Sequence, residues 1–587
     1  MKLRNFGSVF AIAAMALALV VIAPAAASQN DGSQNLTLTG YFSPSSVSSS
    51  GELAPTIDQT PTHSPLNKGL RHTSASGTPD IPGNSIASGA GTAAAWNAIS
   101  HRDQRLAGTG VYKNTQFSLE PPDQGLCVGN GKVVEAVNNA LRVYDTSGNA
   151  LTAVMPLSQV FGLAPEVVRP AGPFGPFVSD PKCYFDVATN RFFLTELELE
   201  VNSANGNFAG PSDQLIAVST SGDPTGTWAI YTFSTTDAGR AGCPCFGDQP
   251  LIGADANGFY ISTNEFGVFS NAYYGAQLYA ISKAALAANA PSPAVTHIDA
   301  GPRTLSQGGL AYSVQPATSP DATFVAANSG TEYFLSTTDW SAGPAIGVRA
   351  NTIEVWALTN TSSLKGASPA LALTNIALAS ELYAQPPNAV QAGGPTPLAD
   401  LVHDRLELLD TNDDRMNQAV FAAGHLWAAA NTAVKPPNGP VVAGIAFFVV
   451  NPSDTNGTLT ATMAKQGYVG VSSQDVMFPS IGVTPAGKAV MAFSLVGPDF
   501  HPSAAYAAIG LSSGAGDIHI AGAGALPDDG FTGYDEITPS VGSARWGDYS
   551  AAVADVNGNI WMAAEYIPNA PRTLFANWGT FVSEVTP

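Results

Sequence analysis

The sequence predicts an all-β fold, a seven-bladed β-propeller, with six or eight blades as alternatives. Three observations carry this prediction. A tight turn followed by an apolar strand recurs along the chain, as in "DVNGNIWMAAEY" (555–566). Two further β-rich runs usually follow each copy. Sustained helical periodicity is almost absent, and "SKAALAAN" (282–289) and "ASELYAQ" (379–385) are the only helices we expect.

The recurring units are spaced by roughly 50 to 80 residues, as in repeat folds built from small sheets. Each unit has room for four short strands, the composition of a propeller blade. The last unit lacks an outer strand, and "TGVYKNTQFSLE" (109–120) precedes the first unit. We therefore expect residues 109–120 to pair with the C-terminal "TFVSEV" and close the ring, which removes exposed sheet edges. The other counterparts of the repeat lie at 129–145, 187–200, 254–266, 319–334, 422–434 and 484–497.

The N-terminus predicts export. Lys2 and Arg4 precede an apolar run from Val9 to Ile22, and small residues end at Ala27. This is the pattern of a signal peptide, residues 1–27, cleaved before Ser28. Residues 28–105 are rich in Ser, Thr, Pro and Gly, so we expect a disordered leader before a propeller domain at 106–587. No later apolar run is long enough to span a bilayer, so the sequence predicts a secreted protein without membrane insertion.

Charge limits the partners. Charged residues make up 12% of the chain and the net charge is −21. An acidic surface repels nucleic acid and anionic membrane, so neither is expected as a partner. We expect a monomer. No cofactor is indicated, and calcium is the one metal that an acidic site could hold.

The four cysteines lie early in the chain, at 127, 183, 243 and 245. An exported chain permits disulfides, and four cysteines allow three pairings. Cys127 and Cys183 follow Asp123 and Asp180 in the innermost strands of consecutive blades, which approach closely. We therefore predict a bond between them, with Cys243 and Cys245 as a strained pair or free. Zinc is the alternative, although no histidine lies nearby in sequence.

Several motifs resemble a family of secreted bacterial β-propeller proteins, mostly uncharacterised. They are "PPDQGLCVGNG" (121–131), "SDPKCYFDVATNRFF" (179–193), "STSGDPTGTW" (219–228), "GDQPLIGADANGFYISTNEF" (247–266) and "RWGDYS" (545–550). The resemblance covers the chain from about residue 120 to its end and implies the propeller fold, but no particular activity. "SGDPTGTW" also resembles the Asp-box of sialidase-type propellers, with its glycine one place late.

The connections of a four-stranded blade divide between the two faces of the disc. First-to-second and third-to-fourth turns share one face, and in this sequence they are short, as in "ANG" and "PAG". The second-to-third loops and the blade crossings share the other face and carry most of the polar and aromatic residues. We therefore expect the ligand site on this loop-rich face, at the end of the central channel.

Carboxylates gather at that end. We predict catalytic roles for Asp180, Asp248, Asp548, Glu265 and Glu565. Crowded carboxylates raise each other's pKa, so that one stays protonated while another ionises, as glycoside hydrolysis requires. The predicted substrate-binding residues are Asp123, Asp414, Arg415, Arg545, Tyr549, Tyr566 and His501.

Each of these residues also has a structural interpretation. An aspartate before a strand often caps a turn by accepting backbone N–H bonds. Trp546 can be a packing wedge between blades. Glu196, Glu198 and Glu200 can be the solvated face of a strand. Both interpretations stay open on the sequence alone.

Two loops could cover the site. Residues 379–415 are longer than a blade crossing needs, and such loops are usually functional or disordered, so a lid is one interpretation. "FGVFSNAYYG" (266–275) brings Phe266, Phe269, Tyr273 and Tyr274 to the same face, for stacking on sugars or for loop packing.

The sequence thus favours a carbohydrate-active propeller, as a glycoside hydrolase, a lyase or a glycan-binding protein. The alternative is a non-catalytic extracellular scaffold or interaction propeller, because the fold hosts both. Whether the protein is an enzyme is left open.

Overall fold

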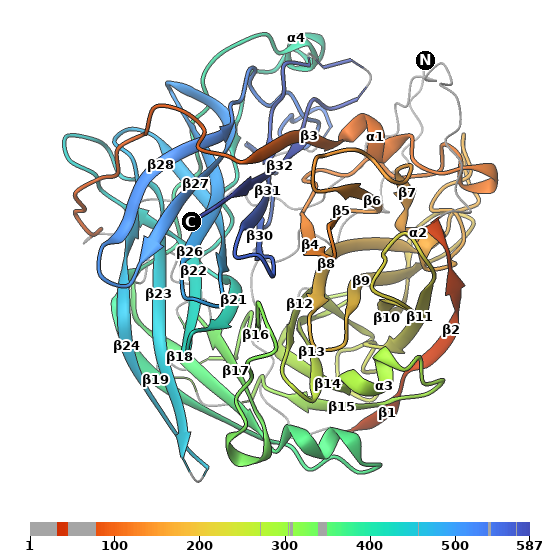
Figure 1. Ribbon diagram of the computed structural model, residues 1–587. Helices are drawn as coiled ribbons and strands as arrows, with labels where there is room; N and C mark the ends of the chain where they lie inside the picture. Colours follow the sequence, from red (N-terminus) through yellow and green to blue (C-terminus); the bar gives the residue numbers. More distant parts are fainter. Residues whose placement is uncertain are drawn as a thin grey trace.

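The structure is a computed structural model that describes residues 32–44, 78–270, 272–302, 305, 309–338, 349–455, 457–537, 542–570, 572–573 and 575–587. The predicted signal peptide lies outside these residues. The described chain is almost entirely β-structure in antiparallel sheets (Figure 1). None of its helices is long and apolar enough to cross a bilayer.

The first strands of the sheets form a closed ring. They are β4 (Gly125–Gly129), β8 (Phe177–Asp186), β12 (Cys245–Ala254), β16 (Gln315–Thr318), β21 (Met416–Ala422), β25 (Asp475–Val483) and β30 (Ala551–Ala554). Each contacts the next, and β30 contacts β4. Figure 1 shows them around a common centre with the later strands outside. Sheets arranged radially about a central channel define a β-propeller.

The remaining strands follow outward in chain order. The β4 blade continues with β5 (Lys132–Val137), β6 (Ala140–Asp145) and β7 (Met155–Pro156), and the β8 blade with β9 (Arg191–Val201), β10 (Phe208–Ser219) and β11 (Trp228–Ser234). The β12 blade adds β13 (Gly258–Gly267), β14 (Tyr273–Ser282) and β15 (Ala294–Asp299), and the β16 blade adds β17 (Thr331–Ser336), β18 (Ala350–Thr359) and β19 (Ala372–Tyr383). The β16 and β21 strands pair in parallel, so their blades form one eight-stranded sheet.

The β21 blade adds β22 (His425–Val434), β23 (Val442–Thr455) and β24 (Thr458–Val469). The β25 blade adds β26 (Ala489–Gly497), β27 (Phe500–Gly510) and β28 (Gly514–Gly522). The β30 blade adds β31 (Ile560–Tyr566) and β32 (Gly579–Val585). Apolar side chains of neighbouring blades interlock between the sheets, and this packing forms the core.

The strand that closes the last blade is not the predicted one. β3 (Ala94–Ser100) pairs antiparallel with β32, with Ala94 opposite Glu584. Residues 109–120, which were predicted to do so, contain only a short 3-10 turn at Gly110–Tyr112. Closure from the N-terminal side is confirmed, but its location was wrong. Trp96 explains why residues 94–100 close the blade in place of residues 109–120, because the centre of its ring lies 5.6 Å from that of Tyr144 and 5.9 Å from that of Trp561.

The predicted disordered leader supplies two more strands. β1 (Ser33–Asn35) extends the β12 blade through β15, and β2 (Thr37–Phe42) extends the β8 blade through β11. Leu36, between them, is fully buried. An edge strand needs only backbone pairing and one buried apolar side chain, here Leu36. The polar composition of this segment therefore did not predict its two strands.

The helices are short. They are α1 (His101–Arg105), α2 (Leu157–Val160), α3 (Lys283–Ala287) and α4 (Pro397–Val402). α3 confirms the helix expected at 282–289. The helix expected at 379–385 is wrong, because residues 379–383 end β19, where Ala379 pairs with Thr352 and Tyr383 with Ala350 of β18. Pairing with a neighbouring strand outweighs the helix propensity of its Ala, Leu and Glu residues.

Candidate functional site

Turn-capping aspartates lie on the face of the short turns. Asp145, Asp186, Asp255 and Asp555 each follow or end a strand, and each carboxylate accepts N–H groups from the next few residues of its own turn. Asp223, in the Asp-box-like turn between β10 and β11, does the same toward Thr225. These aspartates therefore act as turn caps, the structural role that the sequence left open for the aspartates of the site.

The aspartates at the loop-rich end bond differently. Asp123 accepts the Asp548 backbone N–H at 2.7 Å, although the two residues belong to different blades. Asp180 accepts the Gln249 N–H at 3.2 Å, again across a blade boundary. Asp548 accepts the Asn412 side-chain amide at 2.9 Å. Local capping therefore does not account for these carboxylates, which instead join blades at one end of the channel, called the channel mouth below.

The bonds at the channel mouth form a closed circuit. Asn138 donates to Asp123 at 2.7 Å and accepts the Asp180 N–H at 2.8 Å. Arg415 donates to the side-chain oxygen of Gln249, and its second nitrogen lies 3.4 Å from the Asn412 oxygen. With the contacts above, this closes a cycle, the mouth ring: Asp548, Asp123, Asn138, Asp180, Gln249, Arg415 and Asn412.

Backbone kinks place these side chains. Asp123, Asp180 and Gln249 have φ of +50°, +62° and +48°, in the left-handed region. In β8 and β12 the pairing register shifts at this point, so the strand bulges as it enters the ring. The residue in β12 equivalent to Asp180 is thus Gln249, and Asp248 stands one place earlier.

Buried asparagines that were not predicted as site residues support kinks of this kind in three blades. Asn138, Asn264 and Asn431 each accept the backbone N–H of a left-handed residue in the following blade, at 2.7 to 2.8 Å. These partners are Asp180, Ser313 and Phe478. The signal was present in the sequence, because a buried asparagine in or directly after an apolar second strand requires a partner.

Two arginines compensate the mouth carboxylates. Arg415 is buried and holds Asp413 through two bonds of 2.7 Å. Arg545 pairs with Asp548 at 2.5 Å. Asp248 differs: it is 7% exposed, and no hydrogen bond to its carboxyl group is found within the described part of the chain. Burial, followed by the charge of Asp180, raises the pKa of Asp248 well above its usual range, against the opposing effect of Arg415.

The other mouth carboxylates are also perturbed. Burial, followed by the charge of Asp548, raises the pKa of Asp180 to about 6. Burial and the charges of Asp548 and Asp180 raise the pKa of Asp123 well above its usual range. Lys182, which the sequence analysis overlooked, lies 2.7 Å from the centre of the Tyr549 ring, and burial lowers its pKa to about 7. The mouth can thus hold both protonated and ionised carboxyl groups near neutral pH.

Two predicted carboxylates lie in separate clusters. Glu265 pairs with Arg240 at 2.7 Å, and Arg240 also reaches Asp299 at 3.1 Å. Glu565 accepts the Gly547 N–H at 2.7 Å, and its pKa is raised by burial and by Asp528. Neither belongs to the mouth ring.

Of the remaining predicted site residues, some lie at the channel mouth and others lie away from it. Tyr549 is buried at the mouth and donates to the Pro181 carbonyl at 3.2 Å. Asp414 is buried in the crossing before β21. Tyr566 instead bonds Asn97 of β3 at 2.6 Å, and His501 lies in β27, so both stand away from the ring. Trp546 is 1% exposed and donates to Ser494 at 3.0 Å, which confirms the packing wedge.

The two predicted covering loops are packed. In 379–415, α4 bonds Asp529 through the Leu398 N–H at 2.8 Å, and β20 (Leu408–Leu409) pairs with β29 (Ser543–Ala544). Phe266 packs 4.9 Å from Tyr273. Among the four aromatics of 266–275 only Phe269 is exposed, at 68%.

The predicted disulfide is confirmed, and a second is present. Cys127 and Cys183 are bonded between β4 and β8 with Cα atoms 5.2 Å apart. Cys243 and Cys245 are bonded to each other, so their sulfurs are not available as zinc ligands. A Glu265 carboxylate oxygen and these two sulfurs lie within 4.8 Å of one another.

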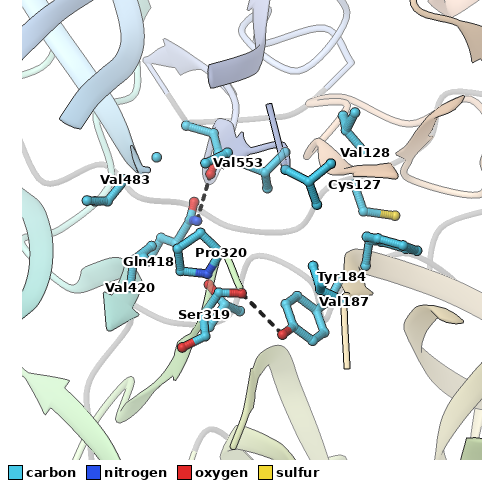
Figure 2. A pocket seen from close by; sticks show the side chains of 16 residues that line it. Cys127, Val128, Tyr184, Val187, Ser319, Pro320, Gln418, Val420, Val483 and Val553 are labelled. Atoms are coloured by element: carbon cyan, nitrogen blue, oxygen red, sulfur yellow. Dashed lines mark hydrogen bonds between the residues drawn. The ribbon is translucent and has the colours of Figure 1, made fainter. Parts of the chain in front are cut away.

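The opposite end of the channel is apolar. A pocket there is lined by the outgoing ends of the first strands, with Val128, Val187, Val420, Val483 and Val553 around Pro320 (Figure 2). Its polar lining includes Gln418 and Tyr184, which donate to the carbonyls of Ala552 and Ser319. None of the predicted site carboxylates lines it.

Comparison with known proteins gave no family. No family model matches the chain, and no curated protein matches it. Among solved structures, Trypanosoma rangeli sialidase in complex with the inhibitor DANA is similar, at 11% identity and a TM-score of 0.31, over 75% of this chain and 56% of that one. The chain therefore spans little more than half of the sialidase.

Two other solved structures are covered almost completely. Penicillium chrysogenum α-L-arabinanase complexed with arabinobiose has 10% identity and a TM-score of 0.29, over 80% of this chain and 94% of that one. The exo-β-1,3-galactanase 1,3Gal43A of Clostridium thermocellum has 11% identity and a TM-score of 0.28, over 82% and 96%.

Proposed function

We propose that this protein is a secreted β-propeller that binds a glycan at the channel mouth and cleaves it with a pair of mouth aspartates. The observation that carries the proposal is Asp248, a buried carboxyl group without a hydrogen bond among the described residues, beside Asp180. An acid that holds its proton next to one that ionises is the pairing that glycoside hydrolysis uses.

The roles follow from the surroundings. Asp248 is the general acid, because burial and the charge of Asp180 favour its protonated form. Asp180 and Asp548 are the candidates for the base or nucleophile; Asp548 is oriented by Arg545 and Asn412. Asp123, Asp414, Arg415, Arg545 and Tyr549 would contact the ligand, since hydroxyl groups pair well with carboxylates and guanidinium groups. Glu265, Glu565, Tyr566 and His501 keep their predicted roles only as hypotheses.

Further details belong to the same proposal. We assign the ring seven blades, one for each first strand. The propeller domain at 106–587 stays a prediction, to which β3 (Ala94–Ser100) is added because it closes the last blade. The family resemblance also stays a prediction. A monomer, calcium at the acidic mouth, and a lid role for 379–415 also remain hypotheses.

The second candidate is a non-catalytic scaffold or interaction propeller. The mouth ring favours it, because Asp123, Asp180 and Asp548 all have partners within the protein. In that case the ring would serve to hold the blades together.

The test is a polysaccharide-degradation and glycan-binding screen on the secreted protein, with Asp248→Asn as the main variant. Asparagine keeps the size and loses the proton, so turnover should fall by roughly 10² or more while the thermal midpoint changes little. Asp223→Asn is the matched control, since Asp223 caps a turn on the opposite face. Binding without turnover would indicate a glycan-binding protein, and neither activity would favour the scaffold.

A further inference from the structure

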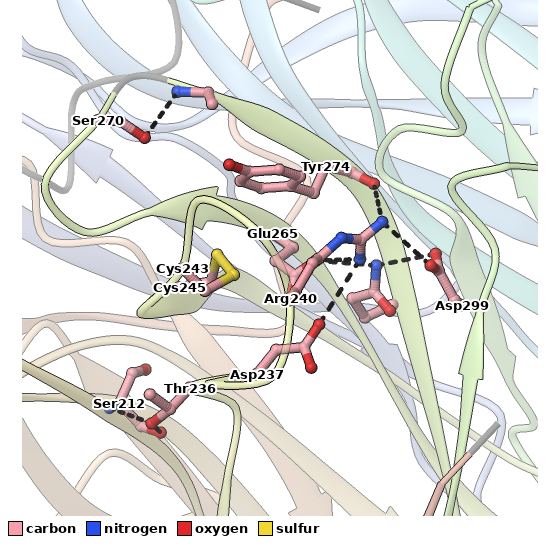
Figure 3. Close-up of a disulfide and its surroundings, with 12 residues drawn as sticks. Ser212, Thr236, Asp237, Arg240, Cys243, Cys245, Glu265, Ser270, Tyr274 and Asp299 are labelled. Atoms are coloured by element: carbon pink, nitrogen blue, oxygen red, sulfur yellow. Dashed lines mark hydrogen bonds and ion pairs between the residues drawn. A yellow bond between two sulfur atoms is a disulfide. The ribbon is translucent and has the colours of Figure 1, made fainter. Parts of the chain in front are cut away.

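The disulfide between Cys243 and Cys245 lies in the crossing from β11 to β12 (Figure 3). Cys245 begins β12 and is fully buried, whereas Cys243 is partly exposed. The two cysteines of the pair therefore differ in their exposure to solvent, and Cys243 is the more exposed one. This asymmetry is what thiol–disulfide exchange needs, because an incoming thiolate must reach one sulfur and displace the other.

The bond contributes little to holding the fold together. Its cysteines are two positions apart, so it closes a loop with a single intervening residue. The Cys127–Cys183 bond, by comparison, spans 56 positions and joins two blades. The stabilisation by a disulfide grows with the length of the loop it closes. A purely structural role therefore explains the Cys127–Cys183 bond far better than the Cys243–Cys245 bond.

A buried acid stands beside the sulfurs. A Glu265 carboxylate oxygen and both sulfur atoms lie within 4.8 Å of one another. Glu265 is 1% exposed. Burial raises its pKa to about 8, although the neighbouring Arg240 opposes this. Burial thus favours the protonated form of Glu265, and this is the form that can give a proton to a sulfur.

The surroundings fix this acid in place. Arg240 bonds one Glu265 oxygen at 2.7 Å, and the Gln277 amide bonds the same oxygen at 3.2 Å. Figure 3 shows the arginine between Glu265 and Asp299, below the Tyr274 ring. The charged and titratable groups around Glu265 within the described chain are Arg240, Asp237, Asp299, the tyrosines Tyr273, Tyr274 and Tyr279 of β14 and, through Gln277, His297.

We propose that Cys243–Cys245 is a redox-active disulfide that exchanges with an external thiol, with Glu265 as the proton donor to the departing sulfur. This activity does not depend on Asp248, Asp180 or Asp548, the mouth aspartates to which the glycan proposal assigns the chemistry.

The exchange balances with a dithiol as the reductant. Its first thiolate attacks Cys243 Sγ, which forms a mixed disulfide and breaks the bond to Cys245. The Cys245 thiolate takes the proton of Glu265. The second thiol of the reductant, once deprotonated, attacks the mixed disulfide and releases Cys243 as a thiolate. Two electrons pass to the protein, the reductant becomes a disulfide, and Glu265 and Cys243 regain protons from solvent.

The first experiment treats the folded protein with reduced glutathione or with reduced thioredoxin, and counts modified cysteines by peptide mass mapping. We expect Cys243 and Cys245 to be reduced while the buried Cys127–Cys183 bond persists, and glutathione to be trapped on Cys243. Reaction with glutathione alone would assign a small thiol as the partner, and reaction with thioredoxin alone a protein dithiol. Reaction with neither, or equal reduction of both disulfides, overturns the proposal.

The second experiment tests the acid. Glu265→Gln keeps the shape but cannot donate the proton, so reduction by a fixed concentration of dithiothreitol should slow by about tenfold or more below pH 8 and approach the wild-type rate above it. Asp299→Asn is the matched control, because Asp299 is the other buried carboxylate that pairs with Arg240 and it is not the proposed proton donor. An unchanged rate and pH profile in Glu265→Gln, with circular dichroism showing a native fold, would refute the role of Glu265. Glycan turnover is measured in parallel, so that failure of the glycan proposal is seen separately.

Discussion

The two ends of the central channel are built from the same first strands but differ in chemistry. At the mouth, polar side chains bond from blade to blade in a ring that contains Asp123, Asp180 and Asp548. At the opposite end, valines at the ends of the first strands line an apolar pocket, and the aspartates cap their own turns. At the exit each aspartate caps its own turn, although Asp186 and Asp255 each also accept a side-chain bond from the next blade, from Lys283 and Thr361. At the entrance, Asp123 and Asp180 instead accept backbone N–H groups of another blade. The role of an aspartate here thus depends on the end of the strand it occupies: mainly turn capping at the exit, and joining of blades at the entrance.

Removing a charge from the mouth ring is the strongest test of this contrast. Arg415→Ala leaves buried Asp413 without its ion-pair partner, so we expect the free energy of unfolding to fall by about 3–5 kcal/mol. Urea denaturation measures this change. Arg405→Ala is the control, because Arg405 is 79% exposed in its pair with Glu407 and should contribute less than about 1 kcal/mol. Equal losses in the two variants would mean that the mouth ring is no more than a surface network.

The pH dependence of stability gives the next largest effect. Burial raises the pKa of Glu166 from 4.5 to about 8; it accepts the Phe117 N–H at 2.6 Å. A carboxyl group with a raised pKa in the folded state stabilises the fold fully below its unfolded pKa, and this stability is lost as pH rises through the folded pKa. The free energy of unfolding should thus fall between about pH 4.5 and pH 8, by at most about 5 kcal/mol for this group, because each unit of pKa shift corresponds to about 1.4 kcal/mol.

Glu166→Gln should flatten that decline, since glutamine resembles the protonated acid. Chemical denaturation at several pH values compares the variant with the wild type. A decline of the same slope in both proteins would assign the effect to other groups, such as Asp180, whose pKa is raised to about 6.

The smallest effect is expected at the apolar end. Val483 is 1% exposed and lines the pocket of Figure 2. Val483→Ala removes buried methyl groups only, so it should lower stability by roughly 1–2 kcal/mol and leave glycan turnover or binding unchanged. A loss of ligand affinity in this variant would place the ligand at the wrong end of the channel for our proposal.

Strand pattern and cysteine position could be predicted because both depend on local sequence. "GNGKVVEAV" (129–137) combines a tight turn with a β-prone apolar run, and it forms the end of β4, the turn and β5, whose residues after Lys132 are all buried. Cys127 and Cys183 stand at similar depths in consecutive first strands, so their pairing followed from the repeat. Residues 94–100 could not be recognised in the same way, because their Ala-rich sequence becomes a strand only against β32, where Trp96 finds Tyr144 and Trp561.

The sequence by itself determined the all-β class, the pairing of Cys127 with Cys183, and the collection of aspartates before the first strands. These features depend on composition and on periodicity along the chain. The tertiary structure alone decided which aspartates meet. A one-residue bulge aligns Asp180 with Gln249 and leaves Asp248 without a hydrogen bond among the described residues. Glu265, which pairs with Gly247 outside this bulge, lies beside the Cys243–Cys245 disulfide and not in the mouth ring. The physical reason is that a bulge shifts the side-chain alternation of a strand, and whether one forms depends on hydrogen bonds from the neighbouring blade.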